Sequence, residues 1–251
     1  MRVSVRQILL LIPVMVIVAA GYAVIKPEQP AIPVAVVKAV DPREGILEEL
    51  STVLRKMDTL TVLTIDGTIT ARDLADSTRN METTFCYCRN GQEAYYRIGQ
   101  QEMLSLQDAY IVVAHDVRKV FLGAPRAVVN PVKFPIGKEA ALLAEEGYEI
   151  TRRVYGTDVH ISLLNRRHPT CRAYDITFDT TGWIKETFMR VADEGNPVDS
   201  TSDKFIGVRI SHFEPGVIRK DLLKSGRYIT VSNGAVKPAP SLSGYELIKD
   251  R

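Results

Sequence analysis

The first regular pattern after residue 40 has a helical period. Apolar side chains recur at intervals of three and four, at Ile46, Leu47, Leu50, Val53, Leu54 and Met57. This spacing gathers them into one stripe and predicts an amphipathic helix. Asp41 can cap the helix, Pro42 suits its first position, and Glu44 completes the spacing of a capping box. The stripe requires a surface against which the helix packs.

From Thr61 onward the period falls to two, which predicts strands with one apolar face. Leu63 and Ile65 alternate with polar residues, and Asn90-Gly91 is typical of a tight hairpin turn. Further strands are expected over residues 83–88, 93–99, 102–106, 109–115, 117–122, 148–155, 159–164, 172–178, 183–191 and 205–213.

Together these elements predict an α+β fold. An antiparallel sheet of this size is expected to curl strongly into a half-barrel, with helices packed on its concave side. Short helices are expected over residues 138–146 and 215–225. We therefore expect one domain at residues 41–226, followed by an irregular C-terminal tail at 227–251.

The N-terminus carries an export signal. Arg2 and Arg6 precede an uncharged apolar run at residues 8–25, and a Pro-rich linker follows at 26–40. Residues 1–25 suit a cleaved signal peptide, and the run is also just long enough for a transmembrane signal anchor. In either case the arginines keep the N-terminus inside, and the domain is expected in the periplasm.

The charge balance argues against nucleic acid as a partner. The chain has 32 basic and 30 acidic residues. Without Arg2 and Arg6, 32 − 2 leaves 30 basic against 30 acidic residues, a net charge of zero. A protein that follows a phosphate backbone usually concentrates positive charge.

Several phrases resemble those of the LolA-like family of outer-membrane lipoprotein carriers. An export signal and an amphipathic helix lead into Met57-Asp58-Thr59-Leu60-Thr61-Val62, and a strand containing glycine follows at residues 64–69. The segment from Asp175 to Lys185 joins two amphipathic strands through a polar turn, as in that family. The resemblance covers roughly residues 43–215 and implies a half-closed barrel, covered by helices, that shields acyl chains from water.

The resemblance implies a periplasmic protein that binds the acyl chains of lipids or lipoproteins, with no cofactor. The alternative is a membrane-anchored scaffold or accessory subunit of a cell-envelope complex, which would use the same fold for protein contacts. Apolar residues of the helix and strands are candidates to line a lipid cavity, although such residues also form ordinary cores. The candidates are Leu50, Leu54, Phe85, Tyr87, Tyr96, Tyr174, Phe178 and Phe188.

Three cysteines allow two interpretations. Cys86 and Cys88 face the same side of one expected strand, where a bond between them would be strained. Cys171 can instead pair with one of them, which suits an exported protein. A weaker alternative joins Cys86, Cys88, His168 and Cys171 as four zinc ligands.

The sequence contains no recognisable catalytic motif. The patterns of the nucleophile elbow, the zinc-protease helix and the phosphate-binding loop are all missing from the sequence. His115, His160 and His212 lie on or beside expected strands, without a serine, cysteine or paired carboxylate at a familiar spacing. We therefore expect a binding protein rather than an enzyme.

Overall fold

The computed structural model describes residues 42–126 and 145–249. The apolar run at 8–25, the linker, Asp41 and residues 138–144 of the helix expected at 138–146 lie outside the described residues. Within the described ranges, no helix has the length and apolar character needed to cross a membrane.

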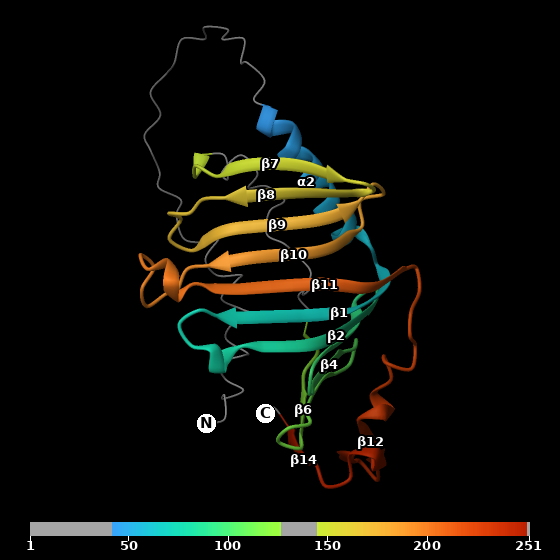
Figure 1. The fold of residues 1–251 in the computed structure, drawn as a ribbon. Helices are drawn as coiled ribbons and strands as arrows, with labels where there is room; N and C mark the ends of the chain where they lie inside the picture. Colours follow the sequence, from blue (N-terminus) through green and yellow to red (C-terminus); the bar gives the residue numbers. More distant parts are fainter. Residues whose placement is uncertain (1–41, 127–144, 250–251) are drawn as a thin grey trace, which may run out of the picture.

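Twelve of the described strands form one sheet (Figure 1). In chain order they are β1 (Val62–Asp73), β2 (Met81–Asn90), β3 (Glu93–Ile98), β4 (Gln101–Ser105), β5 (Tyr110–Ala114), β6 (Lys119–Gly123), β7 (Glu149–Tyr155), β8 (Asp158–Leu164), β9 (Cys171–Asp179), β10 (Ile184–Val191), β11 (Lys204–Pro215) and β14 (Glu246–Lys249). Their order across the sheet is β14-β6-β5-β4-β3-β2-β1-β11-β10-β9-β8-β7. Every neighbouring pair is antiparallel except β14 and β6, which are parallel.

The expected fold class is wrong in its architecture. The described residues contain one α-helix, α2 (Pro42–Thr59), rather than several helices in a concave groove. The sheet is large, mixed and open, with β14 and β7 at its two ends, and it is not curled into a half-barrel. Alternation along a strand shows which face is apolar, but curl depends on twist summed over all strands. The sequence pattern therefore could not decide it.

The local elements were predicted more accurately. Each strand expected between residues 83 and 213 is present, with its ends shifted by at most two residues. The tail departs from expectation, because it contains β14 and a separate hairpin of β12 (Ile229–Ser232) and β13 (Ala235–Pro238). Turns replace the helix expected at 215–225. Short 3-10 helices complete the described elements, at Ser77–Arg79, Ser200–Ser202, Ser225–Arg227 and Pro240–Leu242.

The two faces of the sheet are covered by different parts of the chain. We call the face that packs against α2 the helix face, and α2 lies behind the strands in Figure 1. Its buried cluster includes Leu63 and Ile65 of β1 and Phe85 and Tyr87 of β2. The intervening residues of the same strands point to the opposite face, where Cys86 belongs to a second cluster.

The C-terminal segment, residues 217–249, covers part of the opposite face. Its Leu222, Tyr228 and Leu242 are buried against residues of β2 to β6. Its last strand, β14, extends the sheet edge beside β6. The tail is therefore an integral layer of the fold over one half of the opposite face.

Candidate functional site

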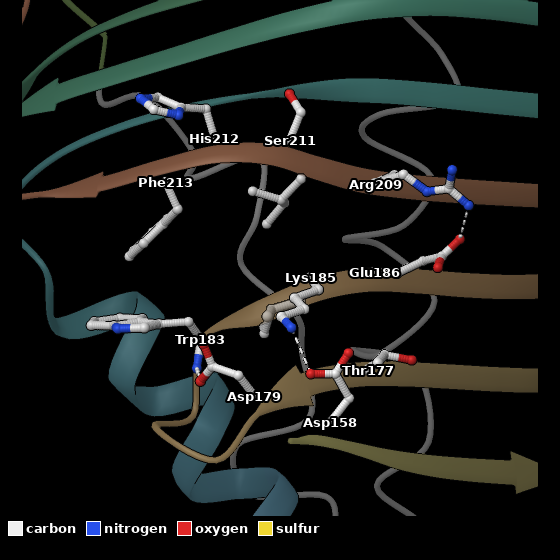
Figure 2. Close-up of a pocket in the computed structure, with 12 residues that line it drawn as sticks. Asp158, Thr177, Asp179, Trp183, Lys185, Glu186, Arg209, Ser211, His212 and Phe213 are labelled. Carbon is white, nitrogen blue, oxygen red and sulfur yellow. Dashed lines mark hydrogen bonds and ion pairs between the residues drawn. The ribbon is translucent and has the colours of Figure 1, made fainter. Parts of the chain in front are cut away.

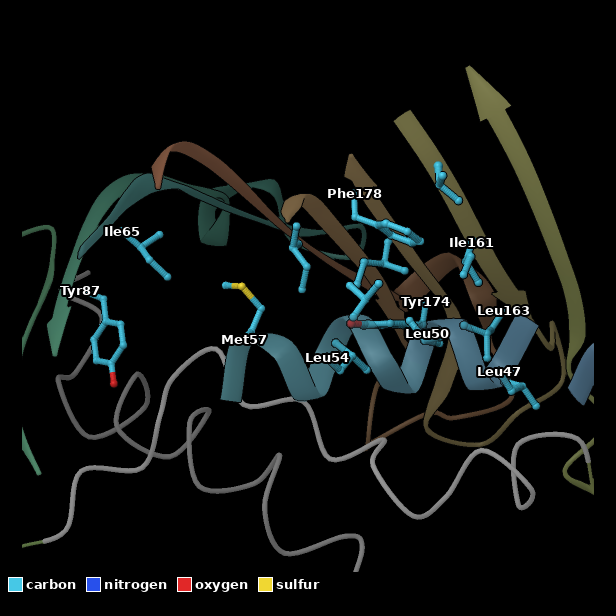
Figure 3. Packing of buried hydrophobic residues seen from close by; sticks show 14 of the residues in the cluster. Leu47, Leu50, Leu54, Met57, Ile65, Tyr87, Ile161, Leu163, Tyr174 and Phe178 are labelled. Carbon is cyan, nitrogen blue, oxygen red and sulfur yellow. The ribbon is translucent and has the colours of Figure 1, made fainter. Parts of the chain in front are cut away.

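Helix α2 attaches to the helix face through its apolar stripe. Leu47, Leu50, Leu54 and Met57 point toward the sheet, near residues such as Ile161 and Phe178 (Figure 3). At the β7 edge, the Arg152 guanidinium donates hydrogen bonds to the Glu49 carboxylate at 2.7 and 3.1 Å. The apolar stripe predicted from the sequence thus becomes one side of the main core.

An apolar row continues across the helix face beyond α2. The residues that face one another on successive strands are Ile65, Tyr87, Tyr96, Met103, Val112 and Phe121. Their exposed fraction rises along the row, from 0% for Ile65 and 1% for Tyr87 to 9% for Tyr96 and 38% for Phe121. Figure 3 shows Met57 near the end of α2, toward Ile65 and Tyr87. The apolar row therefore starts under the helix and leads out to the exposed Phe121 on β6, next to the edge strand β14.

The structure gathers seven of the eight lipid-cavity candidates into one buried cluster on the helix face. They are Leu50, Leu54, Phe85, Tyr87, Tyr96, Tyr174 and Phe178. Phe188 is separate from them. It lies on the opposite face, with its ring centroid 5.5 Å from that of Phe205.

Sequence reasoning missed the outer members of the apolar row, Met103, Val112 and Phe121. Each lies in an expected strand, at a position whose alternation with its neighbours could have indicated that it belongs to one face. Their alignment depends on the pairing register of β4, β5 and β6, which the sequence does not state.

The cysteines are not bonded to one another in the structure. Cys86 and Cys88 are buried on the opposite face, whereas Cys171 packs against the cluster on the helix face. His168 accepts a hydrogen bond from the Cys171 amide through Nδ1 at 3.1 Å, so these two residues are neighbours. Within the described ranges, no three His, Cys, Asp or Glu residues form a metal-binding group, and the proposed zinc set is not assembled. The disulfide in oxidised protein stays a prediction.

A buried polar centre fastens the C-terminal segment to the opposite face. Glu102 of β4 accepts hydrogen bonds from the hydroxyls of Tyr95 at 2.9 Å and Tyr228 at 2.6 Å. His115 Nε2 lies 2.9 Å from Glu102 Oε1, and its Nδ1 lies 2.9 Å from the Tyr245 hydroxyl. Burial raises the pKa of Glu102, but hydrogen bonds from Tyr228, His115 and Tyr95 outweigh burial and lower it. Because Tyr228 and Tyr245 belong to the tail, the centre joins sheet and tail.

Strands β7 to β11 carry two hollows on the opposite face. The first measures about 500 Å³ and lies where β10 and β11 diverge (Figure 2). Lys185 and Glu186 line it from β10, and Arg209 and His212 line it from β11. The second measures about 300 Å³ and crosses β7 to β9. It is lined by Thr151, Arg153, Tyr155, His160, Ser162 and Asp175.

Neither a protein-family model nor a curated protein sequence matches this chain. Similar solved structures include an uncharacterized conserved protein from Thermus thermophilus, at 5% identity over 84% of this chain and 100% of that chain, with a TM-score of 0.41. A LolA superfamily protein from Nitrosomonas europaea is similar at 10% identity, over 73% of this chain and 97% of that one, with a TM-score of 0.33. A DUF1329 family protein from Desulfovibrio piger is similar at 9% identity, over 74% and 98%, also with a TM-score of 0.33.

The sequence resemblance to LolA-like proteins thus has a counterpart among similar solved structures.

Proposed function

We propose that this protein binds acyl chains of lipids or lipoproteins along the apolar row of its helix face. The supporting observation is the gradient of exposure, from fully buried Ile65 to exposed Phe121, along residues that face one another on successive strands. An ordinary core is closed at its edges. Here the apolar surface continues to the solvent, as a binding surface for an apolar chain requires.

The size and chemistry of the row suit an acyl chain. Neighbouring strands lie about 4.8 Å apart, so the accessible members of the row, from Met103 through Val112 to Phe121, span roughly 10 Å. Each methylene removed from water contributes about 0.8 kcal/mol. Part of a fatty acyl chain along this row would supply enough free energy for micromolar binding. The side chain of Met103 is flexible and can adapt to the chain.

Titration of the full chain with a fluorescent fatty acid tests the proposal. Phe121→Asp places a charge at the end of the row, at a side chain that is 38% exposed, and we expect at least about tenfold weaker binding. Val231→Asp is the matched control, because Val231 is 70% exposed on β12, outside the apolar row. Unchanged binding by Phe121→Asp, with saturable binding by the wild type, would place the ligand elsewhere. No saturable binding by folded wild-type protein would refute the proposed function.

We also propose that the domain works outside the cytoplasm, because of the arginines and the apolar run before residue 26. A reporter fused after Arg251 is expected to be active only in an exported compartment. Cytoplasmic activity of the reporter would contradict this localisation.

A further inference from the structure

Both hollows lie on the same open half of the opposite face, on β7 to β11. Thr177 of β9 connects them, because it lines the first hollow and its hydroxyl lies 3.1 Å from Nδ1 of His160 in the second. Among the described residues, the C-terminal segment packs over β2 to β6 and reaches β1 and β11 through Arg219, which pairs with Asp66 and Glu214, but it lines neither hollow. We call the two hollows together the polar trough.

Irregular pairing on both sides of the gap explains why the trough is hollow. In β10 the register shifts between Ile184 and Glu186. In the pairing of β1 with β11 it shifts between Asp66 and Gly67, opposite the segment from Ile210 to His212. Pairing of β10 with β11 therefore begins only at Glu186 and Arg209. Bulges of this kind bend strands and redirect side chains, and they are frequent at functional sites.

The lining of the trough combines charges of both signs in adjacent pairs. Lys185 Nζ lies 2.5 Å from the Asp158 carboxylate, and Arg209 lies 3.3 Å from the Glu186 carboxylate (Figure 2). Apolar side chains also line the first hollow, at Trp183, Ile184, Ile210 and Phe213. The charged and histidine side chains of the lining are four carboxylates, three Lys or Arg and two histidines. These residues are Asp158, Asp175, Asp179, Glu186, Arg153, Lys185, Arg209, His160 and His212.

We propose that the polar trough binds a neutral, hydroxyl-rich glycan chain. A carboxylate only accepts hydrogen bonds and an ammonium or guanidinium only donates them, whereas a sugar hydroxyl does both. Adjacent hydroxyls of one sugar can therefore bond to both members of a pair such as Asp158 and Lys185 without separating them. Hydrogen bonds to charged groups are stronger than those between neutral groups.

The same charges disfavour other ligands. A polyanion needs a surplus of positive charge, which the nearly balanced trough does not offer. An acyl chain would cover the Asp158–Lys185 and Glu186–Arg209 pairs without replacing their contacts with water, which costs free energy. The trough is thus distinct in chemistry from the apolar row on the helix face, and the glycan proposal does not depend on acyl-chain binding.

Calorimetric titration of the full chain tests this proposal with cellohexaose, maltohexaose and chitohexaose as neutral probes and oligogalacturonate as the anionic one. We expect saturable binding of at least one neutral probe and weaker binding of oligogalacturonate. The double variant D158N/K185Q removes one pair without changing net charge, and E186Q/R209Q removes the other. Each is expected to weaken binding at least about tenfold, because several charge-assisted hydrogen bonds are lost.

The matched control is K119Q/E246Q, which removes an exposed pair of 3.5 Å between β6 and β14, outside the trough. This variant is expected to bind the glycan as the wild type does. All variants should keep the wild-type unfolding midpoint and fatty-acid affinity, which separates this test from that of the acyl site. Three results would overturn the proposal: no saturable binding of any neutral probe, preference for oligogalacturonate, or equal affinity of trough and control variants.

Discussion

The Tyr228 hydroxyl donates a 2.6 Å hydrogen bond to Oε2 of Glu102, across 126 residues of sequence. Both side chains are buried, at 2% and 8% exposure. The carboxylate is stabilised in this apolar setting because several donors converge on it. This buried carboxylate thus adds a polar link between the C-terminal segment and the sheet to their apolar contacts.

Removing the Tyr228 hydroxyl is expected to destabilise the fold. Tyr228→Phe leaves the ring in place but deletes a hydrogen bond to a charged group, at a cost of roughly 1.5–3 kcal/mol. Urea unfolding measures this change. Tyr155→Phe is the control, because Tyr155 is 60% exposed, and its midpoint should stay close to that of the wild type. An unchanged midpoint for Tyr228→Phe would show that the tail is held by other contacts.

Stability should depend on pH through Glu102. Its folded-state pKa is lowered below the ordinary value of 4.5, because hydrogen bonds from Tyr228, His115 and Tyr95 outweigh the opposing effect of burial. A lowered folded-state pKa contributes stability above the ordinary value, and this contribution is lost as the pH falls through the folded-state pKa. The difference in unfolding free energy between wild type and Glu102→Gln should therefore be larger at about pH 7 than at about pH 3. A difference that does not change with pH would contradict this role.

The thiol of Cys86 should react slowly in the native protein. Burial raises its pKa to about 12, and the nearby Asp66 carboxylate contributes to the increase. Because the thiolate is the reactive form, labelling by a disulfide reagent at about pH 8 should be far slower in native than in unfolded protein. Mass-spectrometric mapping assigns the labelled cysteine. Rapid native labelling of Cys86 would show that the C-terminal segment leaves this face accessible.

The disulfide predicted from the sequence needs its own test. Peptide mapping of oxidised protein without reduction would show whether Cys171 pairs with Cys86 or Cys88. The pairing would require a rearrangement, since these thiols belong to clusters on opposite faces of the sheet.

Substitution by alanine should change the free energy of unfolding in opposite directions at two glycines. A Cβ at Gly67 would lie 2.2 Å from the Arg209 carbonyl oxygen and 2.5 Å from the Phe85 ring. Gly67→Ala is therefore expected to cost roughly 1–3 kcal/mol or more. Gly45 lies in α2 with nothing within 4 Å of the added Cβ, so Gly45→Ala should stabilise by up to about 1 kcal/mol. Paired urea curves would show midpoints moving in opposite directions, and a shared direction would contradict the packing at Gly67.

The periodicity of the amino-acid sequence is sufficient to predict the local elements. The stripe from Ile46 to Met57 indicated the helix, and the change to alternation after Thr61 indicated the strands, because these periods follow directly from backbone geometry. It also showed which side of each strand is apolar, so most lipid-cavity candidates meet in one cluster. Phe188 is the exception. The register of β10 with β9 shifts between Ile184 and Glu186, and this shift turns the following side chains, including Phe188, to the other face.

Which strands pair, and which segments pack on them, depends on tertiary contacts. Met103, Val112 and Phe121 lie on three different strands, and the alternation within each strand does not show that they face one another. The pairing register of the strands aligns them into one row. The meeting of Glu102 with Tyr228, and of Asp158 with Lys185, likewise depends on packing between distant segments. Long-range contacts also determine the open shape of the sheet, the packing of the C-terminal segment on its opposite face and the parallel pairing of β14. No local period in the sequence encodes these contacts.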